Sequence, residues 1–249
     1  MKAIPSESFK ERVTTMNLNR DEVRSALVGM VIGDGCLSKR HTNGNAYYQM
    51  THCERQHEYL IWKQKILDNI IGSTVHNTLK KMNGKEFKGF HLGSKRHPMF
   101  TKLYNRFYHN KKKVLDEYLV KKITPLAFSI IYMDDGCYGT MDKKHDSFYL
   151  CTQNFDYANQ ILLKKSFKLK FNLDWNLNKA EKDKNDGSYH YRLRLANRCN
   201  DDFLNIVSPY ISKVKCMHYK LGSNANQYLI DTVIYSDLYG DIKSYAEMT

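Results

Sequence analysis

The sequence predicts an α+β protein built from two pseudo-symmetric halves. An apolar segment closed by Asp-Gly-Cys occurs twice, as LVGMVIGDGC at residues 27–36 and as FSIIYMDDGC at residues 128–137. The same order of predicted elements follows each copy, and an internal repeat of this kind indicates a repeated fold unit. A chain of 249 residues is long enough for two halves of ordinary domain size.

The segment before each Asp-Gly-Cys reads as a helix that ends at its glycine. Asn19 is a plausible N-cap of the first helix, with Glu22 three residues later to complete a capping box. The second helix opens with Thr124 as its cap and Pro125 at its first position.

A strand, an amphipathic helix, a β-hairpin and a closing helix are expected after each motif helix. In the first half they span residues 47–52, 58–71, 74–81 with 86–92 about Asn83-Gly84, and 98–108. In the second half they span residues 147–152, 157–167, 174–179 with 188–195 about Asp186-Gly187, and 201–211.

The composition is that of a folded protein with a polyanionic partner. Hydrophobic residues make up 42% of the chain and prolines number only 4, which argues against disorder. Lys and Arg number 39 against 26 Asp and Glu, so the net charge is +13 and the pI is about 9.3. This balance favours nucleic acid first and an anionic membrane surface second.

No apolar run of the sequence is long enough to span a bilayer, and the amino terminus lacks the apolar core of a signal peptide. We therefore expect an intracellular protein, in a bacterial or phage-infected cytoplasm or in an organelle. The six cysteines form no CxxC pair, so we expect reduced, partly buried thiols. They are Cys36, Cys53, Cys137, Cys151, Cys199 and Cys216.

The clearest strand, residues 189–195, alternates apolar residues with His190, Arg192 and Arg194. Alternating charge often marks only a solvated face, but the net charge of the chain favours a surface that contacts phosphates and bases. A two-stranded ribbon fits the major groove, and two different hairpins predict an asymmetric DNA site. The candidate DNA-binding residues are Gln49, Lys81, Lys85, Gln153, Asn178, Lys179, His190, Arg192 and Arg194.

Acidic residues occupy the carboxyl ends of both motif helices, where the helix dipole disfavours them. Asp34, Asp134 and Asp135 would each be an ordinary turn residue if taken alone. Two related helices that both close with Asp-Gly indicate a function, because a local rule broken twice in the same way is a functional signature.

Small residues would let the two motif helices approach closely: Ala26 and Gly29 in the first, Ala127 and Ser129 in the second. If the helices lie side by side, their terminal carboxylates meet at one end. Converging carboxylates suit Mg²⁺, which keeps several waters and also binds substrate phosphates. Such ions promote phosphodiester hydrolysis.

LVGMVIGDG and FSIIYMDDG resemble the two signature motifs of the LAGLIDADG homing endonucleases, in the single-chain branch that carries both. The resemblance covers roughly residues 20–222 and includes YHNKKKVLDEYLVKKITPLAF before the second motif, CTQNF after it and SPYISKVKCMHYKLG near the end.

The resemblance implies an αββαββα fold in each half, with the motif helices at the central interface and two antiparallel sheets forming a DNA-binding saddle. Asp34 and Asp135 would bind the metals, helped by the carbonyls of Gly33 and Asp134. The enzyme would be a monomer that uses Mg²⁺, or Mn²⁺ in its place, to cut both strands of a long asymmetric site and leave short 3′ overhangs.

The family also places one basic residue from each half near the scissile phosphates. By position these are Lys112 and Lys220, with Lys113 as the alternative to Lys112 because the register is uncertain by a residue. The implied catalytic set is therefore Asp34, Asp135, Lys112 and Lys220. Either lysine could stabilise developing charge or polarise the attacking water.

The expected divisions are an N-terminal extension, 1–18; the first half, 19–122; the second half, 123–222; and a C-terminal extension, 223–249. No protein-splicing domain is recognisable, which favours an intron-encoded or free-standing protein over an intein. The alternatives are an intron maturase with intron RNA as a partner, a non-cleaving nucleic-acid-binding protein on the same scaffold, and a basic structural protein without catalysis.

Overall fold

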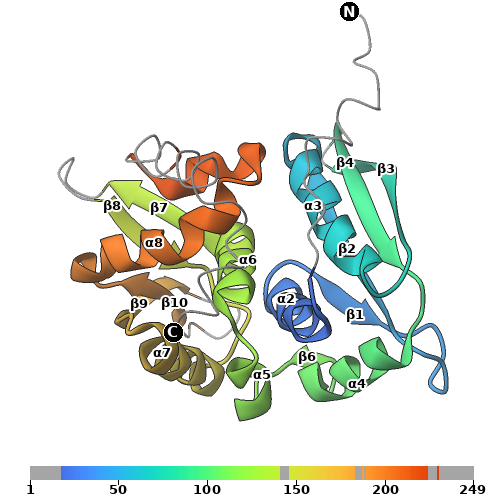
Figure 1. The fold of residues 1–249 in the computed structure, drawn as a ribbon, viewed down its shortest axis with the longest axis horizontal. Coiled ribbons are helices and arrows are strands. Elements are labelled where there is room, and N and C mark those ends of the chain that lie inside the picture. The colour runs from blue at the N-terminus through green and yellow to red at the C-terminus, as the bar shows by residue number, and fades with distance from the viewer. Residues whose placement is uncertain are drawn as a thin grey trace, which may run out of the picture. The chain divides into compact units, whose positions relative to one another are not determined.

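The computed structural model describes residues 18–82, 84–140, 146–182, 187, 189–223 and 229 (Figure 1). It forms two compact units, Met1–Ile130 and Ile131–Thr249. Nearly all of the two predicted terminal extensions lies outside the described residues. No helix among the described residues is long and apolar enough to cross a membrane.

The α+β class and its repeated element order are confirmed. The first unit contains α2 (Arg20–Ile32), β1 (Cys36–Ser38), β2 (Tyr47–Cys53), α3 (His57–Asp68), β3 (Ser73–Met82), β4 (Lys85–Ser94), α4 (Pro98–Phe107), β5 (Tyr108–His109), β6 (Lys112–Lys113), α5 (Glu117–Lys121) and the start of α6 (Pro125–Asp135). The second contains the end of α6, β7 (Gly136–Thr140), β8 (Asp146–Leu150), α7 (Tyr157–Phe171), β9 (Trp175–Lys182), β10 (Tyr189–Leu195), α8 (Asn200–Ile211) and the 3₁₀ segment η3 (Lys215–Leu221).

Each unit has a four-stranded antiparallel sheet with the same strand order. The orders are β1-β2-β4-β3 and β7-β8-β10-β9. Both predicted hairpins form, and Gly84 and Gly187 adopt φ of 74° and 71°, which only glycine takes without strain. The other predicted turn residues, Asn83 and Asp186, lie outside the described residues.

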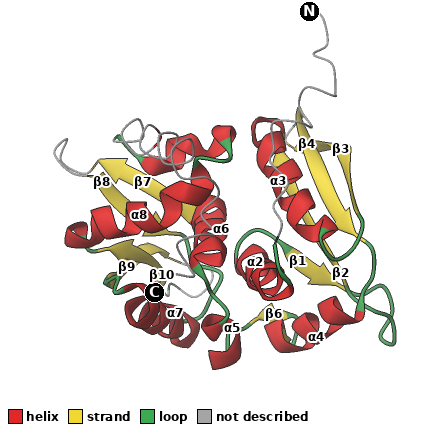
Figure 2. Ribbon diagram, in the orientation of Figure 1, coloured by secondary structure: helices red, strands yellow, loops and turns green. Residues whose placement is uncertain are grey.

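Helices pack on one face of each sheet (Figure 2). In the first unit α3 packs on β2, β3 and β4, where Tyr48, Met50 and Leu92 are buried. In the second unit α7 packs on β9 and β10, and α8 packs on β8. We call the face of each sheet that is turned away from these helices the open face.

Within the first unit, α2 lies against the beginning of α6. A Cβ built on Gly29 would lie 2.5 Å from the carbonyl oxygen of Ala127, so the backbones touch as the small residues predicted. The hydroxyls of Ser25 and Thr124 share a hydrogen bond of 2.6 Å at the same contact. The predicted capping box at Asn19 and Glu22 also forms.

Some element boundaries differ from the predictions for local reasons. α3 ends at Asp68 rather than near residue 71, because Asp68 accepts hydrogen bonds from the backbone and hydroxyl of Ser73. α7 continues to Phe171, where Asn172 ends it in the left-handed conformation. The boundary between the two compact units lies inside α6, after Ile130, whereas the predicted halves divide at residue 123, because the first turns of α6 pack on α2.

Candidate active site and nucleic-acid interface

Asp34 follows α2 in a tight turn of the first unit. Gly33 caps the helix, and the backbone N–H of Gly35 donates a hydrogen bond of 2.9 Å to the carbonyl of Met30. A Cβ at Gly35 would collide with that carbonyl and with the ring of Tyr48, so glycine is required here for space. The turn leaves the Asp34 side chain 44% exposed at the end of the helix.

Lys113 reaches this turn from the short β5–β6 hairpin. Its ammonium donates hydrogen bonds to the carbonyls of Gly33, at 3.0 Å, and of Gly35, at 2.9 Å. The lysine therefore holds both residues that flank Asp34. The predicted metal ligand Gly33 O accepts a hydrogen bond from an ammonium group, which is an unfavourable neighbour for a metal cation.

The turn of this hairpin decides which lysine contacts the Asp34 turn. Asn110 and Lys111 both have positive φ, 48° and 65°, so the hairpin closes over two residues. Tyr108 then pairs with Lys113, and His109 pairs with Lys112, which is exposed. The structure thus brings Lys113, and not the predicted Lys112, to the Asp34 turn.

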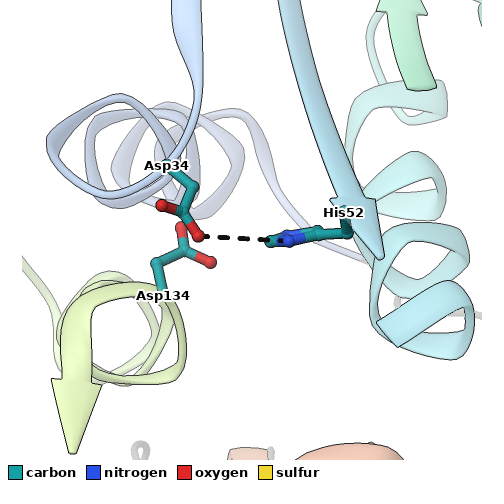
Figure 3. A group of neighbouring side chains, drawn as sticks. All are labelled: Asp34, His52 and Asp134. Carbon is teal, nitrogen blue, oxygen red and sulfur yellow. Dashed lines mark ion pairs between the residues drawn. The ribbon is translucent and has the colours of Figure 1, made fainter. Parts of the chain in front are cut away.

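His52 lies beside Asp34, which the sequence did not indicate. Its Nδ1 is 4.0 Å from Oδ2 of Asp34, and the imidazole is buried on the inner face of β2 with its ring 5.4 Å from that of Tyr59. Figure 3 shows the Asp34–His52 pair as a dashed line, and it also labels Asp134, which belongs to the second unit. The sequence signal for His52 is the alternation of side chains along β2, which places His52 on the same face as the apolar residues Tyr48 and Met50.

The motif helix of the second unit includes its acids, whereas α2 ends at Ile32 and Asp34 follows it. α6 runs through Asp134 and Asp135, both partly exposed, and Gly136 begins β7. The carbonyl of Asp135 accepts a hydrogen bond of 2.8 Å from the backbone of Cys151. A Cβ at Gly136 would collide with Tyr132, so this glycine too is required for space.

Lys220 occupies in the second unit the role that Lys113 has in the first. It is buried in η3, and its ammonium donates a hydrogen bond to the carbonyl of Gly136, the repeat counterpart of Gly35. Its own carbonyl accepts a 2.7 Å hydrogen bond from the hydroxyl of Tyr132. Each unit therefore has an Asp-Gly turn contacted by one lysine.

Two free thiols lie next to the second turn. The sulfur atoms of Cys137 and Cys151 are 3.9 Å apart. The hydrogen bond from Cys151, with Arg192 and Lys220 nearby, lowers the pKa of Cys137 to about 6, and the same pairing raises the pKa of Cys151. All six cysteines are free thiols.

Polar groups occupy the open face of the first sheet. Gln49 lies there and donates a 2.9 Å hydrogen bond to Ser38. His91 shares a 3.0 Å hydrogen bond with Thr51, and its ring centroid is 4.9 Å from that of His76. Burial, with His76 and Lys80 nearby, lowers the pKa of His91.

The two lysines predicted from this hairpin lie on opposite faces. Lys85 has the strand parity of His91 and is exposed on the open face. Lys81 has the opposite parity and forms a 3.0 Å ion pair with Glu86, its cross-strand neighbour. The structure therefore removes Lys81 from the open face.

Two arginines occupy the open face of the second sheet. The Arg192 guanidinium lies 4.3 Å from the centre of the Tyr149 ring, and Arg194 donates a 3.2 Å hydrogen bond to Ser147. Asn178 lies directly opposite Arg192 on β9. The Nε atoms of both arginines are buried without a hydrogen-bond partner among the described residues.

The other three residues of the second unit that were predicted to bind DNA do not share the strand positions of Asn178, Arg192 and Arg194 on the open face. Lys179 is opposite Tyr191, on the face covered by helices, with its ammonium 4.4 Å from the centre of the Tyr189 ring. Gln153 lies in the turn after β8 rather than on a strand. His190 lies at an irregularity in the pairing of β10 with β9 and is partly exposed.

The repeated motif helices, the two like sheets and the paired Asp-Gly turns define a known class of protein. The family model of the LAGLIDADG DNA endonuclease family matches residues 24–203, and the chain belongs to this family.

Individual relatives fall in three groups. The homing endonuclease I-WcaI, solved bound to its DNA recognition sequence, has a TM-score of 0.70 and 25% identity, over 87% of this chain and 91% of that one. Cytochrome b mRNA maturase bI2 of Debaryomyces hansenii is 26% identical over 86% of this chain and 79% of its own length. Protein RecA of Mycobacterium gastri is 27% identical over 81% of this chain, which spans only 47% of that protein.

Proposed function

We propose that the protein is a site-specific double-strand DNA endonuclease of the homing type, encoded in an intron or a free-standing gene. One observation carries the proposal: the same combination of a terminal aspartate, a glycine turn and a lysine occurs once in each unit. Two such half-sites in one chain suit the hydrolysis of two strands by a monomer. The DNA-bound I-WcaI structure supports DNA as the substrate.

The donor groups fit a hard divalent cation such as Mg²⁺ or Mn²⁺. Asp34 is partly exposed at the end of α2, which leaves room for the waters and phosphate oxygens that Mg²⁺ retains. We propose that Asp34 holds one ion and Asp135 another, with Asp134 contributing at most its carbonyl. The bound ions would activate water and stabilise the leaving oxygen.

Lys113 and Lys220 would act on the phosphate. Each ammonium group is fixed by turn carbonyls beside its acid, so it needs little reorganisation to face negative charge that develops during cleavage. We propose Lys113 in place of Lys112, because only the former reaches the Asp34 turn. Breaks with short 3′ overhangs are expected from the resemblance to the family.

We propose that each open face contacts its own half of a long, asymmetric DNA site. The two arginines can each make bidentate bonds to guanine, and the amides of Gln49 and Asn178 can do so to adenine. Lys85 and His190 would contact phosphates, and Gln153 would contact DNA from its turn. We do not retain Lys81 and Lys179, because both lie on helix-covered faces.

A cleavage assay tests the proposal. The DNA would be the sequence that flanks the reading frame, joined across it, and Mg²⁺ should produce a double-strand break there. Asp34→Asn and Asp135→Asn should abolish that break and leave DNA binding intact. Absence of cleavage of this DNA, or equal cleavage by both variants, would refute the endonuclease proposal.

The maturase relatives favour a second candidate function, assistance of intron RNA folding. Its test is an in vitro splicing reaction of the host intron with and without the protein. Under this second proposal Asp34→Asn supports splicing as well as the wild type does, because RNA binding does not need the carboxylate. Splicing that is unchanged by the protein would exclude this role.

A further inference from the structure

The acid of the first unit has an imidazole neighbour, whereas the corresponding residue of the second unit is a threonine. Cys36 and Cys137 are counterparts in the repeat, and they pair with Gln49 and Tyr149, respectively. Gln49 therefore corresponds to Tyr149, and three residues later His52 corresponds to Thr152. Thr152 is buried and donates a 3.0 Å hydrogen bond to Gln160 in the core of its own unit. His52 instead faces an acid, so the two half-sites are chemically different.

The distance between the two groups fits a shared cation. Nδ1 of His52 lies 4.0 Å from Oδ2 of Asp34, which is longer than a direct hydrogen bond. A divalent ion holds nitrogen and oxygen ligands about 2.1 Å away, so two ligands of one ion are separated by up to about 4.2 Å. The observed separation falls within this limit.

The surroundings of His52 hold its ring toward the acid. The side chain is buried on the inner face of β2, and the Tyr59 ring packs 5.4 Å from the imidazole. The Asp34 carboxylate is 44% exposed and so open to an ion and its waters. The pair thus combines a fixed nitrogen donor with an accessible oxygen donor (Figure 3).

We propose that His52 is a nitrogen ligand, together with Asp34, of the divalent ion in the first unit. Imidazole is a better ligand for transition-metal ions, whose affinity series for nitrogen and oxygen sites begins with Mn²⁺, than for Mg²⁺, which prefers oxygen ligands. The first half-site therefore prefers Mn²⁺ over Mg²⁺ more strongly than the second, where Thr152 replaces the histidine. This inference rests on the proposed metal role of Asp34.

Metal binding tests the inference without any cleavage. In an Asp135→Asn background, Mn²⁺ binding is measured by electron paramagnetic resonance, and His52→Gln should weaken it about tenfold. His57→Gln is the matched control, because His57 lies in the same unit with its ring stacked 3.7 Å from that of Phe90. Equal Mn²⁺ affinity in the two variants, or no Mn²⁺ binding in the background protein, would overturn the proposal.

Strand-resolved cleavage provides a second readout. In the wild type, replacing Mg²⁺ by Mn²⁺ should accelerate cutting of one strand more than the other. His52→Gln should remove this difference by slowing the Mn²⁺-supported cutting of the favoured strand, whereas a purely structural role would slow both strands in both metals.

An unchanged strand difference in His52→Gln contradicts the inference. A protein that binds Mn²⁺ through His52 but cuts no DNA would instead refute the endonuclease proposal alone. Urea unfolding of His52→Gln and His57→Gln verifies that both variants fold. If the glutamine variant does not fold, His52→Asn replaces it in both measurements.

Discussion

Gly29→Ala should destabilise the first unit, although alanine is the better helix former. A Cβ at Gly29 would lie 2.5 Å from the Ala127 carbonyl oxygen and 2.9 Å from its Cα, so backbone must move. Overpacking of this kind costs about 1–3 kcal/mol, and contact with backbone places this case near the upper end. Helix propensity returns about 1 kcal/mol, so the net loss is about 2 kcal/mol.

Urea unfolding and thermal melting measure this loss. A deficit of about 2 kcal/mol corresponds to a melting temperature about 4–8 °C lower for a protein of this size. Gly139→Ala is the control, because a Cβ there meets nothing within 4 Å, and its stability should stay within about 0.5 kcal/mol of the wild type. A Gly29→Ala variant that is more stable than the wild type would show that α2 and α6 do not approach as described.

Four further predictions concern charge and reactivity. Lys113→Met should slow single-turnover cleavage about 100-fold, because it removes the ammonium group beside the Asp34 turn. The cleavage rate of Lys112→Met should stay within about twofold of the wild-type rate, and the reverse order would assign the active-site role to Lys112. Arg194→Gln should weaken DNA binding by about 1–3 kcal/mol in anisotropy titrations, and an unchanged affinity would remove Arg194 from the interface. Because the pKa of His91 is lowered, His91 is neutral at pH 7 and gains its positive charge only at lower pH. DNA affinity should therefore rise as the pH falls below about 6.5, and His91→Gln should remove that part of the rise. A wild-type pH profile of DNA affinity in the variant would contradict this prediction. Iodoacetamide should label Cys137 at a rate that is half-maximal near pH 6, as measured by mass spectrometry with Cys137→Ser as the control. Labelling only at alkaline pH would refute the lowered pKa of Cys137.

Features set by local sequence could be predicted from it. Asn19 and Glu22 lie three residues apart and cap α2 regardless of the rest of the fold. Gly84 and Gly187 close hairpins because a positive φ favours glycine at those positions. The paired aspartates could be found because the repeat itself signals them.

Features set by pairing between distant segments could not be predicted in the same way. β1 has only three residues and exists because it pairs with β2, and its sequence, CLS, has no strand signal of its own. Lys113, rather than Lys112, contacts the Asp34 turn because Lys111 adopts a left-handed conformation that lysine rarely takes. A shift of one residue in a strand moves a side chain to the other face.

The faces of hairpin residues are subject to the same limit. Lys81 and Lys85 looked equivalent in a basic hairpin, but the register places Lys81 opposite Glu86. His52 read as one polar residue among several in a predicted strand. Only the fold shows that it faces Asp34.

The position of α6 constrains how such proteins could be recombined. The helix contributes its first turns to the first unit, where Ala127 touches Gly29, and it ends with the acid of the second unit. A chimera joined just before Pro125 would therefore bring a foreign helix surface onto α2. Exchange of halves between relatives would require residues 26–29 to be matched to the incoming helix, so we expect functional chimeras only between partners that share this small-residue contact.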